Sequence, residues 1–116
     1  MKILLDTNFI ITSLKFKIDI FSEIRRIAYF NYEIFVLDKT IDELKKLKNK
    51  LALQIIDKYN VKITKTSENL DADALLILYA DSETIVATQD RELRKALKKK
   101  NIRILSIRQK NYYIII

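Results

Sequence analysis

Short apolar runs alternate with helix-like segments along the whole chain, and this alternation is the strongest constraint on its fold. The strand-like runs are Lys2–Leu5, Glu33–Leu37, Val61–Thr66, Thr84–Ala87 and Arg103–Ile107, with a sixth expected at Tyr112–Ile116. Strands separated by helices need crossover connections, which produce a mostly parallel sheet with helices on both faces. We therefore predict a three-layer α/β/α sandwich. The length of 116 residues and the 49% hydrophobic content suit one domain over residues 1–116.

Helical apolar periodicity fills the segments between the strands. The first helix, around Asn8–Leu14, is short and apolar. Buried faces are predicted at Ile20, Ile24, Ile27 and Ala28, at Ile41, Leu44, Leu47 and Leu51 of a third helix, at Leu75, Leu76 and Tyr79, and at Leu93, Ala96 and Leu97. The chain has no Gly and no Pro. Because Asn is the next choice after Gly for the left-handed residue that ends a helix, Asn31, Asn60 and Asn101 are predicted helix stops.

Missing residue types exclude most catalytic chemistries. Without His or Cys, the chain has no imidazole base, no thiol nucleophile and no usual zinc site. Without Gly it has neither a Walker phosphate loop nor a dinucleotide-binding loop. Catalytic Lys, Tyr or Ser stay open but lack a recognisable setting. The main chemistry left is a hard cation such as Mg²⁺ or Mn²⁺ held by carboxylates.

Acidic residues stand at four successive strand-to-helix junctions. Asp6 follows the first strand, Glu43 and Asp73 lie in the first turns of the helices after the second and third strands, and Asp90 follows the fourth. Each alone could be an ordinary helix cap. A parallel sheet would bring all four to one edge, where they would repel one another unless a cation or protons neutralised them. We call Asp6, Glu43, Asp73 and Asp90 the acidic quartet; Glu43, deepest in its helix, is its least secure member.

Four local motifs give the chain a family resemblance. They are Asp6-Thr7-Asn8, then Asp42-Glu43-Leu44 followed by Leu47, then Asp73-Ala74, and Thr88-Gln89-Asp90 followed by Leu93. In order and spacing this set resembles the PIN domain over essentially the whole chain. The resemblance implies a Mg²⁺- or Mn²⁺-dependent endoribonuclease whose metal is held by the acidic quartet.

The same resemblance implies supporting polar residues. Asn8 and Thr88 match positions that orient the carboxylates by hydrogen bonds. Asp71 is a further acid that equally fits a helix cap, which we favour. Asp38, Asp42 and Glu92 are expected to be solvated surface acids.

Positive charge is concentrated near the end of the chain. The net charge is +7, and residues 91–116 carry nine basic side chains and one acidic one. Such a cluster can be a solubilising surface or a site for a polyanion. Because the predicted helix begins next to Asp90, we expect Arg91, Arg94, Lys95 and Lys98 to bind RNA, either single-stranded or structured rRNA or tRNA.

The uncharged run Tyr112–Ile116 is predicted to form a strand at the sheet edge. An apolar edge strand invites pairing unless it is covered. We therefore expect a homodimer contact or a protein partner there. No segment has the roughly 18 apolar residues of a membrane span, and we expect a cytoplasmic protein.

Alternative functions remain open at this level. Two PIN branches fit, a toxin ribonuclease of VapBC type and a ribosomal RNA-processing enzyme. Val86–Lys95 and Ile104–Tyr112 look more like the processing branch. A catalytically inactive RNA- or protein-binding module is the second class. A phosphoacceptor receiver domain would need an Asp at the end of the third strand, where this chain has Lys65-Thr66-Ser67.

Overall fold

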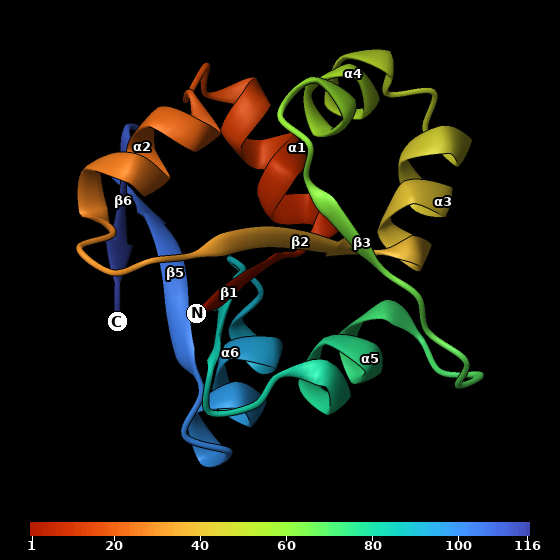
Figure 1. Cartoon of the computed structure of the whole chain (residues 1–116), viewed down its shortest axis with the longest axis vertical. Helices are drawn as coiled ribbons and strands as arrows, with labels where there is room; N and C mark the ends of the chain where they lie inside the picture. The colour runs from red at the N-terminus through yellow and green to blue at the C-terminus, as the bar shows by residue number, and fades with distance from the viewer.

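The computed structural model describes all 116 residues and contains six strands and six helices (Figure 1). The strands are β1 (Lys2–Leu5), β2 (Glu33–Leu37), β3 (Lys62–Thr64), β4 (Thr84–Ala87), β5 (Arg103–Arg108) and β6 (Tyr112–Ile115). The helices are α1 (Thr7–Lys15), α2 (Ile20–Ile27), α3 (Asp38–Lys46), α4 (Lys50–Lys58), α5 (Ala72–Tyr79) and α6 (Arg91–Lys99). None of these helices is long and apolar enough to cross a membrane.

All six strands form one sheet in the order β3-β2-β1-β4-β5-β6. The first five strands are parallel, and β6 runs antiparallel to β5. Figure 1 shows α1 to α4 on one side of the sheet and α5 and α6 on the other. The predicted three-layer α/β/α class is therefore confirmed.

Side-chain alternation along the central strands builds two cores. Ile3 and Leu5 of β1 belong to a cluster of 18 buried residues on the face covered by α1 to α4. Leu4, between them, belongs to a cluster of 10 buried residues beneath α5 and α6. Because both faces are buried, the central strands read as continuous apolar runs rather than as alternating ones. Helices thus cover both faces of the sheet, whereas the edge formed by the carboxyl ends of its parallel strands lies outside the two cores.

The prediction of a single third helix is wrong, because this segment forms two helices, α3 and α4. Helix α3 ends with Leu47 as its C-cap residue, and the next residue, Lys48, takes a left-handed conformation with φ 55°. Asn49 then caps α4, its side chain accepting a hydrogen bond from the backbone N–H of Ala52 at 3.1 Å. Leu47 and Leu51, expected on the buried face, are 62% and 55% exposed. A capping Asn after a left-handed residue outweighs the continuous apolar periodicity.

Turns are made without glycine. Asn60 and Asn101 have φ values of 53° and 62° after α4 and α6, as predicted. The prediction for Asn31 is wrong, since α2 already ends at Ile27 with an extended cap residue. Other left-handed positions are occupied by Lys17, Lys48, Gln109 and Lys110. A left-handed conformation costs a non-glycine residue about 1–2 kcal/mol, so these turns must be held by the packed elements around them.

Strand β3 ends at Thr64, two residues earlier than predicted, because Thr66 is hydrogen-bonded to the side chain of Asp38 and not to a neighbouring strand. The carboxylate of Asp38 accepts hydrogen bonds from Thr66 N at 2.9 Å and from Thr66 Oγ1 at 2.8 Å. These bonds, with one from Lys39 N, hold the pKa of Asp38 below its usual range. Asp38 is therefore not the solvated acid we expected, but the tie between the start of α3 and the chain after β3.

The edge strand β6 is covered by the chain itself. Glu23 and Arg26 of α2 form an ion pair at 2.9 Å. Glu23 Oε1 accepts a hydrogen bond from Tyr113 N at 3.0 Å, and Arg26 Nη2 donates one to Tyr113 O at 3.1 Å. Figure 1 shows α2 beside β6. The outward backbone groups of Tyr113 are thus paired within the chain, which removes part of the reason to expect a partner there.

Candidate functional site

Asp6 lies at the centre of the carboxyl edge of the sheet. It directly follows β1, and its backbone N–H donates to Ala87 O of the neighbouring β4 at 3.0 Å. Only 5% of Asp6 is exposed. Since β1 and β4 are parallel neighbours, the residues that follow them, Asp6 and Thr88, come together.

Thr88 links two members of the acidic quartet. Its hydroxyl donates to Asp6 Oδ2 at 2.9 Å and accepts from the backbone N–H of Asp90 at 3.1 Å. Gln89, between them, accepts from Ile107 N at 2.8 Å and so fastens this turn to β5. The carboxyl end of β4 is therefore rigidly placed beside Asp6.

Glu43 reaches the edge from α3. Its Oε1 accepts a hydrogen bond from Thr7 Oγ1 at 2.9 Å. Thr7 is the first residue of α1 and follows Asp6 directly. This bond therefore fixes the carboxylate of Glu43 to the residue next to Asp6.

The other acids stand at the starts of α5 and α6. Asp71 caps α5, its side chain accepting from Ala74 N at 2.8 Å, which is the cap role we favoured for it. Asp90 caps α6 in the same way, accepting from Leu93 N at 2.9 Å through Oδ1. Asp73 lies in the first turn of α5, is exposed, and makes no side-chain hydrogen bond. Asp73 is thus the acid that is freest to turn toward a ligand.

Electrostatics shows that the quartet acts as one group of charges. Burial raises the pKa of Asp6, which the hydrogen bond from Thr88 partly offsets and the charges of Asp73, Glu43 and Asp90 increase further. The pKa of Asp73 is raised by partial desolvation and by the charges of Asp90, Asp71 and Glu43. The ion pairs of the chain are Arg26–Glu23, Lys62–Glu33 and Lys95–Glu92, and none involves a quartet member. No member of the quartet is therefore neutralised by an ion pair with a Lys or Arg side chain.

The donor chemistry of this edge fits a hard divalent cation. Asp6, Glu43 and Asp90 each have one oxygen held by a hydrogen bond and the other without one. No buried side-chain oxygen of the chain lacks a partner, so these second oxygens remain accessible. Oxygen donors with a clustered negative charge are what Mg²⁺ and Mn²⁺ prefer. No three of the carboxylates converge closely enough to hold one ion as they stand, so a cation would be held here only after side chains rotate.

The predicted RNA-binding residues surround one hollow. A cavity of about 400 Å³ is lined by Arg91, Arg94, Lys95 and Lys98 and by no apolar residue. Lys95 is paired with Glu92 at 3.6 Å, and no salt bridge involves the other three. Arg91 is adjacent in sequence to Asp90, which caps the same helix. The structure thus brings a basic hollow, with three of its four side chains outside any ion pair, next to the acidic edge.

One predicted supporting residue is not brought to the site, and two were missed. Asn8 is exposed and makes no side-chain hydrogen bond, so it orients none of the carboxylates. The hydroxyls beside a quartet carboxylate are those of Thr7, which is hydrogen-bonded to Glu43, and of Thr40, which is hydrogen-bonded to Thr7. Thr7 stands within the Asp6-Thr7-Asn8 motif, and Thr40 is three residues before Glu43, on the same helix face. That spacing is the signal that could have found them.

Known proteins match both the sequence and the fold. Residues 3–110 match the family described as "PIN like domain". The chain is 36% identical over 125 aligned residues to ribonuclease VapC4 of Methanocaldococcus jannaschii, covering 98% of this chain and 95% of that protein. A solved structure of the PIN domain endonuclease Utp24 superimposes with a TM-score of 0.86 at 27% identity, covering 98% of this chain and 90% of that one. With its carboxylates gathered at one sheet edge, the chain belongs to the PIN-like domain family of nucleases.

Proposed function

We propose that this protein is a Mg²⁺- or Mn²⁺-dependent endoribonuclease that hydrolyses RNA phosphodiester bonds. The observation that carries the proposal is the acidic quartet, four carboxylates at one sheet edge with no cationic partner and with free oxygens. The similarity to ribonuclease VapC4 and to the endonuclease Utp24 supports the reaction class.

In the mechanism we propose, each residue of the edge has a distinct task. Asp6, Glu43, Asp73 and Asp90 would hold the metal, and Thr88 keeps Asp6 and the backbone of Asp90 in place. When bound, the metal supplies a water of lowered pKa and stabilises the charge that develops on the phosphate oxygens. The basic hollow on α6 neutralises backbone phosphates beside the cleavage point. No histidine is needed for this route, which agrees with a chain that has none.

The cellular role we favour is RNA processing, on the sequence resemblance of the last quarter of the chain to the processing branch. A VapC-type toxin is the second candidate, because the 36% identity to ribonuclease VapC4 favours it. With either role, we propose that the protein acts in the cytoplasm. Inhibition of growth on expression, relieved by the product of a neighbouring gene, would favour the toxin over the processing enzyme.

The decisive experiment is cleavage of RNA by the purified chain. Single-stranded and structured RNA are incubated with the wild type in Mn²⁺ and in EDTA, beside Asp6→Asn and Asp73→Asn. We expect cleavage in Mn²⁺ alone, and losses in both variants larger than the roughly 10- to 100-fold typical of an outer-shell substitution. Asp42→Asn, which removes an exposed acid of α3, is the matched control and should cleave like the wild type.

Each other outcome points elsewhere. Cleavage that survives both substitutions would overturn the assignment of the site. RNA binding without cleavage of any RNA would favour an inactive binding module. A receiver domain is not supported, since β3 ends at Thr64 and the next segment is bound to Asp38.

A protein partner at the C-terminal segment stays a proposal. Tyr29 is 86% exposed and Ile116 is 37% exposed, and a hollow of about 340 Å³ beside them is lined by apolar residues of β6 and by Arg26 and Arg103. A second copy of the chain would cover these side chains.

A further inference from the structure

Glu43 is a quartet member whose position the strands do not determine. Asp6 directly follows β1 and Asp90 comes three residues after the end of β4, whereas Glu43 is the sixth residue of α3. Its carboxylate could adopt several rotamers, and the loss of that freedom opposes binding of any ligand. Some other contact must therefore select the rotamer that faces the edge.

Two buried hydroxyls make that contact. Thr7 Oγ1 lies 2.9 Å from Glu43 Oε1 and 3.0 Å from Thr40 Oγ1. Thr7 is 3% exposed and Thr40 is 1% exposed. The three side chains therefore form a short hydrogen-bonded chain between the first turns of α1 and α3.

The direction of this chain follows from proton count. A hydroxyl has one proton, and an ionised carboxylate only accepts hydrogen bonds. Thr7 must therefore donate its proton to Glu43, and the contact with Thr40 is satisfied by the proton of Thr40. Glu43 Oε1 is held in this way while Oε2 has no hydrogen-bond partner. In the same way, Thr88 donates a hydrogen bond to Asp6 Oδ2, while Asp6 Oδ1 has no hydrogen-bond partner.

We propose that Thr7 and Thr40 are positioning residues that hold Glu43 ready at the acidic edge and so set the metal affinity of the site. This inference rests on the proposed function, because it needs the quartet to bind the metal. Neither threonine touches the metal or the RNA. Their effect is exerted only through Glu43, in the way that outer-shell hydrogen bonds orient metal ligands.

The test measures Mn²⁺ affinity of the whole chain by titration calorimetry, with thermal unfolding in EDTA as a separate readout. Thr7→Val keeps the shape of the side chain and removes the hydroxyl, and it should weaken Mn²⁺ binding about 10-fold. Thr7→Ser keeps the hydroxyl and should bind within about 2-fold of the wild type, by the same reasoning. Thr40→Val should weaken binding less than Thr7→Val, and it carries the test if Thr7→Val does not fold.

Ser13→Ala is the matched control. Ser13 also carries a fully buried hydroxyl on α1, but it pairs with Tyr113 OH at 2.6 Å, on the side of β6. This variant should lower stability and leave Mn²⁺ affinity unchanged. A loss of Mn²⁺ affinity in Ser13→Ala as large as that in Thr7→Val would overturn the proposal. It would mean that removing any buried hydroxyl of α1 weakens Mn²⁺ binding, whether or not that hydroxyl contacts Glu43.

A double-mutant cycle separates positioning from general damage. In a Glu43→Ala background, Thr7→Val should cause no further loss of Mn²⁺ affinity, because the residue through which it acts is gone. Equal affinity of Thr7→Val and the wild type, or an undiminished loss in the Glu43→Ala background, would overturn the inference. A wild type that binds no Mn²⁺ would instead overturn the proposed function.

Discussion

At the scale of single residues, the site combines a buried acid with hydroxyls that hold it. Asp6 is 5% exposed, and its neighbours at the edge are acids and not cations. An ionised group in such a place is costly for the folded state unless a cation or a proton neutralises it. The same negative charges that would bind a metal therefore lower the free energy of unfolding of the metal-free chain.

The pH dependence of the metal-free chain follows from Asp6. Burial raises the pKa of Asp6 above the usual 3.8, so the folded state holds this proton more tightly than the unfolded state. Stability therefore falls as the pH rises from 3.8 through the raised pKa, and the loss persists at higher pH. Asp6→Asn removes the charge and can still accept the hydrogen bond of Thr88.

We expect Asp6→Asn in EDTA to unfold a few degrees above the wild type at pH 7, with a smaller decline across that pH window. Thermal unfolding by circular dichroism measures both quantities. Asp42→Asn, at an exposed position, is the control and should follow the wild type. An Asp6→Asn chain less stable than the wild type at pH 7 would show that the buried charge of Asp6 does not destabilise the metal-free fold.

At the scale of elements, α2 protects the sheet edge. The Glu23–Arg26 pair satisfies both outward backbone groups of Tyr113, as a neighbouring strand would. Edge strands left open are sites of pairing between chains. A short helix with one ion pair therefore covers the outward backbone groups of Tyr113, while the exposed side chains of Tyr29 and Ile116 stay available to a partner.

The double variant Glu23→Ala/Arg26→Ala tests this cover. Hydrogen bonds to charged groups contribute about 1.5–3 kcal/mol each when well buried, and these side chains are partly exposed. We therefore expect a lower free energy of unfolding than in the wild type, together with more self-association than the wild type shows on size-exclusion chromatography. Glu92→Ala breaks the exposed Lys95–Glu92 pair, which covers no strand, and should change stability by less than about 0.5 kcal/mol. A double variant that self-associates no more than the wild type would show that the edge needs no cover from α2.

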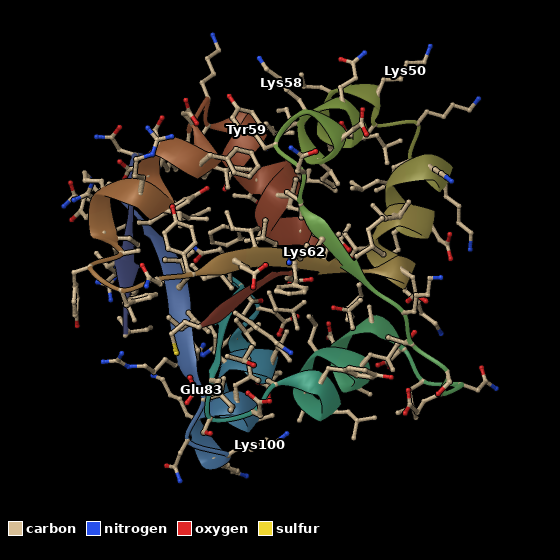
Figure 2. The ribbon with its side chains drawn as sticks, viewed as in Figure 1. Lys50, Lys58, Tyr59, Lys62, Glu83 and Lys100 are labelled. Carbon is tan, nitrogen blue, oxygen red and sulfur yellow. The ribbon has the colours of Figure 1, made fainter.

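At the scale of the whole molecule, positive charge is gathered on α6, which begins directly after Asp90 of the acidic edge. The basic hollow lies on α6, on one side of the sheet. Figure 2 shows Lys50 and Lys58 of α4 on the opposite side of the sheet from Lys100, which follows α6. We propose that residues 1–116 act as one domain, because both cores share the single sheet.

These two lysine-bearing faces allow a matched comparison. Arg94→Ala/Lys98→Ala should weaken binding of single-stranded RNA and reduce the salt dependence of log K by about 1.4, since each phosphate contact contributes about 0.7. Lys50→Ala/Lys58→Ala removes the same charge from α4 and should change the salt dependence much less. Fluorescence anisotropy in EDTA over a series of salt concentrations measures both. Equal slopes for the two double variants would show that RNA binding follows net charge alone.

The sequence by itself determined the local features of this protein. Apolar periodicity located the six strands, and the absence of histidine, cysteine and glycine left carboxylate-bound cations as the main catalytic chemistry. The acids at the strand-to-helix junctions were also visible, because a parallel sheet delivers such junctions to one edge. Periodicity failed where side-chain capping outweighed it, at Asn49 and at Asp38.

Only the tertiary structure decided which distant residues meet. Thr7 and Glu43 are 36 positions apart, Thr88 and Asp6 are 82 apart, and Glu23 and Tyr113 are 90 apart. Their contacts depend on the strand order β2-β1-β4 and on the packing of α1 against α3 and of α2 against β6. Periodicity reports the face of an element but not its neighbour. The four acids and Thr88 could therefore be named from the sequence, whereas the hydroxyls of Thr7 and Thr40 beside Glu43, and the exposure of Asn8, required the folded chain.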